Sequence, residues 1–177
     1  YNRLLDDENM MVITDQTAGI DSVGTSMFCA SEINLFVVEP TMKSIGIIKD
    51  FENVTKNYNL KNYVVINKAL DESDVEFVKR ELGEEKVIGV ISYSSNIRRY
   101  EQGDKEKFNL FIEENKEVFE KILNLVKNTK KDWKQYKERL YDIYKKNCET
   151  WYSEYYGVDL LRIYKQWIWL WKGYKGE

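Results

Sequence analysis

Residues 62–70 read NYVVINKAL, and this stretch decides the fold class. Its first part, NYVVI, is a short apolar run rich in β-branched side chains, which is typical of a strand buried on both faces. Comparable runs occur at 10–14 (MMVIT), 34–39 (NLFVVE) and 87–91 (VIGVI). We expect these four segments to be strands of one sheet.

The segments between the predicted strands have apolar residues at helical spacing. This spacing predicts helices over about 43–57 and about 72–82. The second helix begins in an acidic turn, which suits the positive end of the helix dipole, and Gly83 is placed to cap its other end. Strand–helix–strand alternation predicts an α/β fold, a parallel sheet with flanking helices.

Polar residues follow the predicted strands at the positions where such sheets bind ligands, beyond the carboxyl ends of the strands. Asp15 can hold magnesium through water, because magnesium takes few protein carboxylates. Gly19 can bring its backbone N–H against a terminal phosphate, where a side chain would obstruct. A turn after a strand is the alternative for this pair, since a lone D-x-x-x-G is a weak signal.

Three further strand ends complete the predicted site: Glu39-Pro40, Asn67-Lys68 and Ser92-Tyr93. The amide of Asn67 offers a donor and an acceptor, which match a purine edge. Lys68 can lay its alkyl stem along a base or a ribose. Together the strand ends suit a nucleoside triphosphate.

The composition narrows the function classes. The 177 residues carry a net charge of only -3, so overall charge does not indicate nucleic-acid binding. The chain has no histidine, which removes His-based acid–base catalysis and His metal ligands. Cys29 and Cys148 lie far apart without a secreted disulfide pattern, which favours a reducing, cytoplasmic location.

Charge and aromatic residues divide the chain near Gly103. Acidic residues outnumber basic ones before it, the reverse holds after it, and all five tryptophans follow it. We therefore expect a nucleotide-binding α/β domain over 1–103 and a charged, aromatic-rich helical extension over 104–177. Apolar spacing predicts helices over about 105–127 and 133–155 in this extension, followed by a short terminal helix.

Four segments carry a resemblance to a known family: DQTAGID (15–21), NLFVVEPTMKSI (34–45), VVINKAL (64–70) and VIGVISYSSNIRRYEQGD (87–104). They resemble the later half of the P-loop ATPases of the MinD/ParA type. Within that group they are most similar to CooC-type accessory ATPases of carbon monoxide dehydrogenase maturation. The resemblance covers about residues 8–103.

The resemblance implies an ATP-driven homodimer that hydrolyses ATP with Mg²⁺. It implies a magnesium-associated Asp15 and a γ-phosphate-sensing Gly19. It also implies adenine contacts from Asn67, Lys68 and the segment after Ile91, which includes Ser92 and Tyr93. The CooC-type subgroup further implies nickel maturation of a client metalloenzyme.

The lysine-bearing phosphate loop of such ATPases has no counterpart in this sequence. No G-x-x-x-x-G-K-[ST] motif occurs anywhere in it. We therefore interpret the chain as the carboxyl-terminal fragment of an ATPase, or as one half of a split protein. The chain alone should not hydrolyse ATP.

The aromatic tail, 158–175, has a second interpretation besides packing. Its tryptophans, with basic residues around them, could lie in a membrane interface. Nucleic-acid binding is disfavoured because acidic residues in the helical extension weaken the positive electrostatic potential of its basic residues. The alternative function is thus a non-enzymatic interaction or membrane-surface module.

Overall fold

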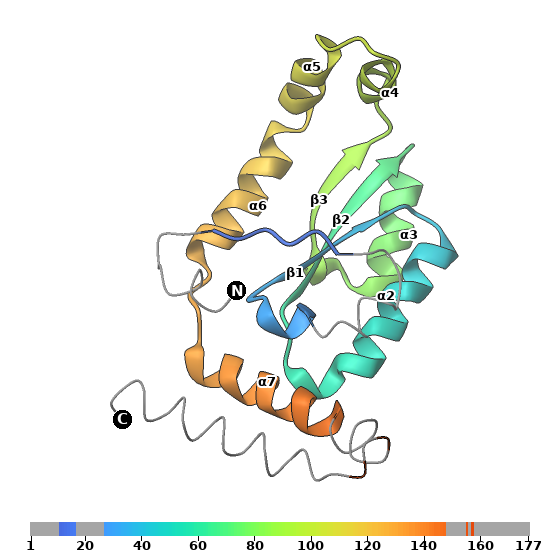
Figure 1. Ribbon diagram of the computed structural model, residues 1–177. Coiled ribbons are helices and arrows are strands. Elements are labelled where there is room, and N and C mark those ends of the chain that lie inside the picture. The colour runs from blue at the N-terminus through green and yellow to red at the C-terminus, as the bar shows by residue number, and fades with distance from the viewer. Residues whose placement is uncertain (1–10, 17–26, 148–154, 156, 158–177) are drawn as a thin grey trace. The chain divides into compact units, whose positions relative to one another are not determined.

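The computed structural model describes residues 11–16 and 27–147, together with Tyr155 and Gly157. Contacts divide the chain into a first unit, Tyr1–Lys131, and a second unit, Asp132–Glu177. The first unit contains the sheet and the helices that cover it (Figure 1). The domain boundary near Gly103 stays a prediction, although α6 (Lys116–Asn128), which follows it, packs on the sheet.

The sheet has three parallel strands in the order β1-β2-β3. They are β1 (Asn34–Val38), β2 (Asn62–Ala69) and β3 (Val87–Ser92). β2 lies in the centre and pairs along both edges, side chains from helices pack on both of its faces, and its residues 64–66 are no more than 2% exposed. This arrangement confirms the α/β class, the parallel sheet and the strands expected at 34–39, 62–66 and 87–91.

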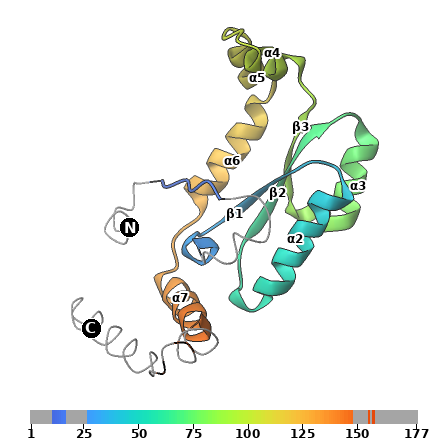
Figure 2. The same ribbon diagram turned by 45° about the vertical axis from the view of Figure 1, so that its right-hand side comes forward.

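One face of the sheet is covered by α2 (Met42–Thr55) and α3 (Glu72–Leu82) (Figures 1 and 2). Short 3-10 turns follow them, η3 (Lys56–Tyr58) and η4 (Glu84–Lys86). Both helices agree with the ranges predicted from apolar spacing. The core between them and the strands consists of Val38, Ile45, Ile48, Val64, Ile66, Ala69, Val75, Val78 and Leu82.

The ends of α3 are set by local chemistry. The Asp71 carboxylate accepts hydrogen bonds from the backbone N–H groups of Ser73 (2.9 Å) and Asp74 (3.3 Å), which satisfies two of the helix's open donors. At the other end Gly83 has a φ of 98°, and its N–H donates to the Lys79 carbonyl at 2.9 Å. The predicted glycine cap is confirmed.

The opposite face of the sheet is covered by α6. Val118 of this helix packs with Val65 and Ile91 of the sheet. The close approach depends on Gly89 in β3, where an added Cβ would lie 2.5 Å from Val118 Cγ1. Strand glycines of this kind mark places where another element comes near.

The helical region after β3 is more broken than the sequence predicts. A short α4 (Ser95–Glu101) was not expected, and the helix predicted over 105–127 is divided into α5 (Lys107–Glu114) and α6. The division falls at Asn115, whose side-chain amide donates to the Phe111 carbonyl at 2.8 Å. Asparagine competes for backbone groups in this way and so favours helix ends, a local effect that apolar periodicity does not register.

The strand predicted at 10–14 is wrong for its described part. Residues 11–16 have no regular secondary structure, and the Ile13 side chain is 92% exposed. An apolar, β-branched run acquires strand structure only when a neighbouring strand supplies hydrogen-bond partners. The described strands give this run no partner, so its composition alone misleads.

The second unit contains α7 (Trp133–Asn147). Tyr136, Arg139 and Ile143 are buried at helical spacing, and the Trp133 and Tyr136 rings meet edge to face at 5.7 Å. The helix predicted over 133–155 is thus confirmed as far as residue 147. The aromatic tail, 158–175, and Cys148 lie outside the described residues.

Candidate functional site

The three parallel strands end at one edge of the sheet (Figure 1). Glu39 directly follows β1, Lys68 lies one residue before the end of β2, and Ser92 is the last residue of β3. Parallel sheets bind ligands at this edge because the strand ends and the loops after them converge there.

Lys68 occupies a β-bulge. Asn67 pairs with Ile91 and Ala69 pairs with Ser92, so Lys68 has no counterpart in β3. Its φ of 60° lies in the left-handed region, which is uncommon for a residue other than glycine and is strained. Bulges beside functional sites redirect side chains, and this one alters the course of β2 at its carboxyl end.

The redirected lysine forms an ion pair across the strand ends. Lys68 Nζ lies 2.5 Å from Glu39 Oε1. The hydrogen bond to Glu39 and the charge of that carboxylate raise the pKa of Lys68, with smaller contributions from Glu101 and Tyr93. Because both side chains are about half exposed, the pair contributes little to stability. The pair matters for the shape of the site, because it holds the Lys68 ammonium group beside Glu39 at the end of β1.

Asn67 lies inside β2, whereas the sequence placed it and Lys68 after the strand. The ladder continues past the apolar run because the bulge lets Ala69 pair with Ser92. Asn67 is half-buried and pairs with Ile91, so it lies on the face of the sheet that α6 covers. The structure therefore brings Asn67 and Lys68 to the expected edge, but within the sheet.

The segment after β3 is tied to the same edge. The backbone N–H of Tyr93 donates to the Ala69 carbonyl at 2.9 Å. The Tyr93 ring is 50% exposed, and its hydroxyl accepts a hydrogen bond from Arg98 at 3.4 Å. Ser92 and Tyr93 thus lie beside the end of β2, next to the bulge at Lys68.

A carboxylate far along the chain holds the next turn in place. Ser94 caps α4, and its hydroxyl donates to Glu114 Oε2 at 3.0 Å. The Asn96 side-chain amide donates to Glu114 Oε1 at 2.5 Å. Sequence reasoning missed these residues. Ser94 could have been found as a helix-capping residue, but no local pattern indicates Glu114, which is 20 residues away.

The chain also turns sharply after β1. The Thr41 N–H donates to the Glu39 carbonyl at 2.7 Å, and the Thr41 hydroxyl oxygen accepts from the Ser44 N–H at 3.2 Å. The threonine and serine that contribute to the family resemblance therefore begin α2 as a capping pair. Their geometry places the start of α2, Met42, three residues after Glu39.

The structure does not place the other two predicted site residues, Asp15 and Gly19, at this edge of the sheet. Asp15 is exposed in the segment without secondary structure, and Gly19 lies outside the described residues. Asp15 therefore does not terminate a paired strand as the sequence suggested. Its role as a magnesium ligand, and the role of Gly19 at the γ-phosphate, stay predictions.

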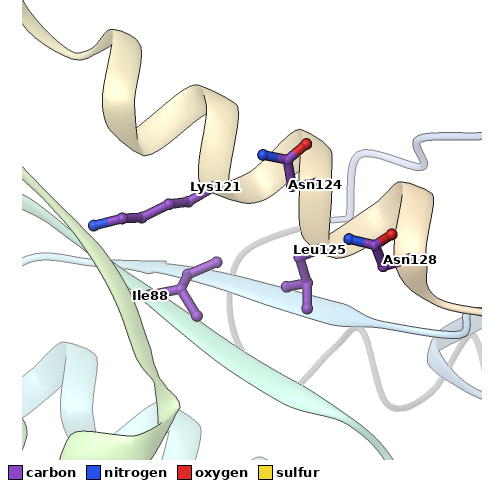
Figure 3. Close-up of a pocket in the computed structure, with 5 residues that line it drawn as sticks. All are labelled: Ile88, Lys121, Asn124, Leu125 and Asn128. Carbon is purple, nitrogen blue, oxygen red and sulfur yellow. The ribbon is translucent and has the colours of Figure 1, made fainter.

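An open surface pocket of about 430 Å³ lies away from the strand ends. It is lined by Ile88 near the start of β3 and by Lys121, Asn124, Leu125 and Asn128 of α6 (Figure 3). Within the described residues no cluster of three or more His, Cys, Asp or Glu side chains could hold a metal ion. No helix among them is long and apolar enough to cross a membrane.

Comparisons with known proteins give two relatives, both from Methanocaldococcus jannaschii. The chain is 33% identical over 126 residues to "Uncharacterized ATP-binding protein MJ0823", a match that covers 67% of this chain and 48% of the relative. It is 29% identical over 89 residues to "Uncharacterized ATP-binding protein MJ0084", over 50% of this chain and 35% of the relative. No family model and no solved structure matches. The chain thus spans half or less of the length of these relatives.

Proposed function

We propose that this chain is part of an ATP-binding protein and that the carboxyl edge of its sheet holds the nucleoside end of ATP. The observation that carries the proposal is the joining of Lys68, Asn67 and Tyr93 at one sheet edge by the bulge in β2 and the Tyr93–Ala69 hydrogen bond. We take ATP as the nucleotide because both relatives are named ATP-binding proteins.

Each residue of the edge has a distinct role in this proposal. The Asn67 amide reads the purine edge through a donor and an acceptor. The Lys68 stem lies along the base or ribose, and Glu39 holds its ammonium on the β1 side. Ser92 and Tyr93 border the base from the β3 side, with the exposed tyrosine ring offering an aromatic surface.

The finer part of the proposal concerns the whole protein. Asp15 holds Mg²⁺ through water, Gly19 contacts the γ-phosphate, and hydrolysis requires a phosphate loop that this sequence does not contain. The whole protein acts as a cytoplasmic homodimer of the MinD/ParA type, and its CooC-type resemblance suggests a client metalloenzyme that receives nickel. The chain alone binds ATP no more tightly than about 1 mM, or roughly -4 kcal/mol.

A nuclear magnetic resonance titration of the full 177-residue chain tests the nucleotide site. Adding ATP, adenosine or inorganic tripolyphosphate in separate titrations should move the backbone amide signals of Asn67, Lys68 and Tyr93 with the first two ligands only. Asn67→Ala and Lys68→Met should weaken the response. Asn124→Ala and Lys121→Met are matched controls, because they remove an exposed amide and an exposed, ion-paired lysine from α6.

Two results would count against the proposal. Signal changes produced equally by tripolyphosphate would indicate general anion binding, and changes that survive both site variants would place the nucleotide elsewhere. Magnesium-dependent ATP turnover by the chain alone, abolished by Asp15→Ala, would contradict the expectation that the chain by itself is inactive.

The alternative function uses the aromatic tail, 158–175, as a membrane-surface or interaction module. It predicts co-sedimentation with anionic lipid vesicles that weakens with salt and disappears in Trp167→Glu. No binding, together with unfolding of the helical part by the same substitution, would support packing of the tail instead.

A further inference from the structure

The turn after β3 is held by a carboxylate that lies beyond the domain boundary predicted near Gly103. Glu114, the last residue of α5, accepts a hydrogen bond from the Ser94 hydroxyl at 3.0 Å and another from the Asn96 side-chain amide at 2.5 Å. Each bond uses a different carboxylate oxygen. Hydrogen bonds to a charged acceptor are stronger than those between neutral groups. Two of them from one side chain fix both the position and the orientation of the turn.

Glu114 is itself anchored to the sheet. The next residue, Asn115, is buried, and its side-chain amide ends α5 by donating to the Phe111 carbonyl at 2.8 Å. α6 begins immediately afterwards and packs on β3, where Val118 lies against Gly89. The carboxylate is therefore held by a junction between two helices that is packed on the sheet.

The two helices on either side of the turn between them also meet directly. α4 and α5 lie side by side beyond the end of β3 (Figures 1 and 2). The rings of Tyr100, near the end of α4, and Phe108, near the start of α5, have centroids 5.0 Å apart. This contact joins the far ends of the helices, and Glu114 joins the ends that are nearer to the sheet.

The turn that Glu114 holds carries Tyr93 of the nucleotide edge. The Tyr93 N–H donates to the Ala69 carbonyl at 2.9 Å, and its hydroxyl accepts from Arg98 of α4 at 3.4 Å. Because the ring is 50% exposed, packing alone does not hold it in place. Its position depends on the bond to Ala69 on one side and on the placement of α4 by Glu114 on the other.

We propose that Glu114 is a positioning residue for the nucleotide edge, and that it sets the affinity for ATP by keeping Tyr93 and the turn after β3 in one arrangement. The inference rests on the proposed function and adds to it a residue from the region that the sequence assigned to a separate helical extension. Without the two hydrogen bonds the turn samples further arrangements. The apparent affinity then falls with the fraction of molecules that keep the binding arrangement. Glu114 acts through the turn and needs no contact with the nucleotide.

ATP titrations of the full 177-residue chain, followed at the backbone amide signals of Asn67 and Tyr93, test the inference. Glu114→Ala should raise the apparent dissociation constant about threefold or more, because it removes both acceptors from the turn. Glu114→Gln keeps one acceptor oxygen and should lie between Glu114→Ala and the wild type. Glu113→Ala removes the neighbouring exposed carboxylate and is the matched control.

The direction of the change separates positioning from charge. Removing a carboxylate near an anionic ligand would by itself strengthen ATP binding, and Glu113→Ala measures the size of that effect. Weaker binding in Glu114→Ala would have the opposite sign. Asn96→Ala removes one of the same hydrogen bonds without changing the charge, so its effect and that of Glu114→Ala should be less than additive in the double variant.

Two failures can be told apart. If the wild type binds ATP at Asn67 and Tyr93 but Glu114→Ala and Asn96→Ala bind it equally well, or if Glu113→Ala weakens binding as much, the positioning role is overturned and the proposed function stands. If Glu114→Ala does not fold, Glu114→Gln and Asn96→Ala decide in the same way. A wild-type chain that shows no response to ATP at these residues would refute the proposed function, and the positioning role with it.

Discussion

Gly89 of β3 lies directly under Val118 of α6, and the helix approaches the sheet only because the strand has no side chain there. A Cβ on Gly89 would lie 2.5 Å from one Val118 methyl carbon and 3.2 Å from the other. Val118 is 9% exposed and stiff at χ1, so it cannot move aside without disturbing its neighbours.

We therefore expect Gly89→Ala to lower the free energy of unfolding by about 1–3 kcal/mol, the usual cost of overpacking a core. Urea denaturation followed by circular dichroism measures this loss. Val118→Ala removes the obstructing methyl groups, so the double variant should be more stable than the sum of the single effects, with a coupling of about 0.5–3 kcal/mol. Strict additivity would mean that the two residues do not meet.

Gly83 and Gly46 should respond oppositely to alanine. Gly83 has a φ of 98°, so Gly83→Ala should destabilise the protein by about 1–3 kcal/mol through backbone strain. Gly46 lies inside α2 with nothing within 4 Å of an added Cβ, and Gly46→Ala should stabilise the protein by about 0.5–1 kcal/mol. Thermal unfolding of both variants checks the sign. A stabilising Gly83→Ala would refute the assigned cap geometry.

Asp71 should make stability depend on pH. The hydrogen bond from the Ser73 side chain, followed by those from the Asp74 and Ser73 backbone N–H groups, lowers the pKa of Asp71 below its usual 3.8. A carboxyl group whose pKa is depressed on folding stabilises the fold above 3.8, and this contribution is lost as pH falls through the lower, folded value. Asp71→Ala should thus lower the melting temperature at pH 7 but have little effect at the acid end.

The pH test has a neutral control. Asp71→Ser keeps a capping oxygen without a titrating group, so its difference from Asp71→Ala should not vary with pH. A wild-type advantage that persists unchanged in acid would show that the carboxylate charge is not responsible.

Glu114 should govern the mobility of the segment after β3. Glu114→Ala removes the acceptor for the Ser94 hydroxyl and the Asn96 amide, and hydrogen bonds of this kind contribute about 0.5–1.5 kcal/mol each. Because two such bonds are lost, amide hydrogen exchange over residues 94–101 should accelerate by about fivefold or more. Glu113→Ala, which removes the neighbouring exposed carboxylate, is the control and should leave the segment unchanged.

Much of the architecture could be predicted from local signals. The structure contains all of the following predicted elements: the strands at 34–39, 62–66 and 87–91 and the helices at 43–57 and 72–82. They were predictable because a strand buried on both faces has a continuous apolar run, and a helix packed on a sheet has apolar residues at helical spacing. The Gly83 cap was also predictable, because the positive φ at the end of a helix favours glycine. The strand at 10–14 failed because strand pairing requires a partner that composition cannot supply.

The candidate site was only partly predictable. Asn67, Lys68, Ser92 and Tyr93 do reach one sheet edge, as expected of strand ends in a parallel sheet. The bulge at Lys68 and its pair with Glu39 were not foreseen, because they depend on the register between strands 29 residues apart. Glu114 was not foreseen either, since its partners meet it only through the turn between α4 and α5.

The sequence by itself determined the order of the three strands and of the two helices between them, the parallel class of the sheet and the side of it where polar residues gather. These follow from the periodicity of apolar residues and from the direction of the chain, both of which are local properties. Only the tertiary structure decided where β2 bulges and which carboxylates hold Lys68 and the β3 loop. Those features arise from pairing and packing between distant segments, which minimise unsatisfied backbone groups and exposed apolar surface over the whole sheet at once.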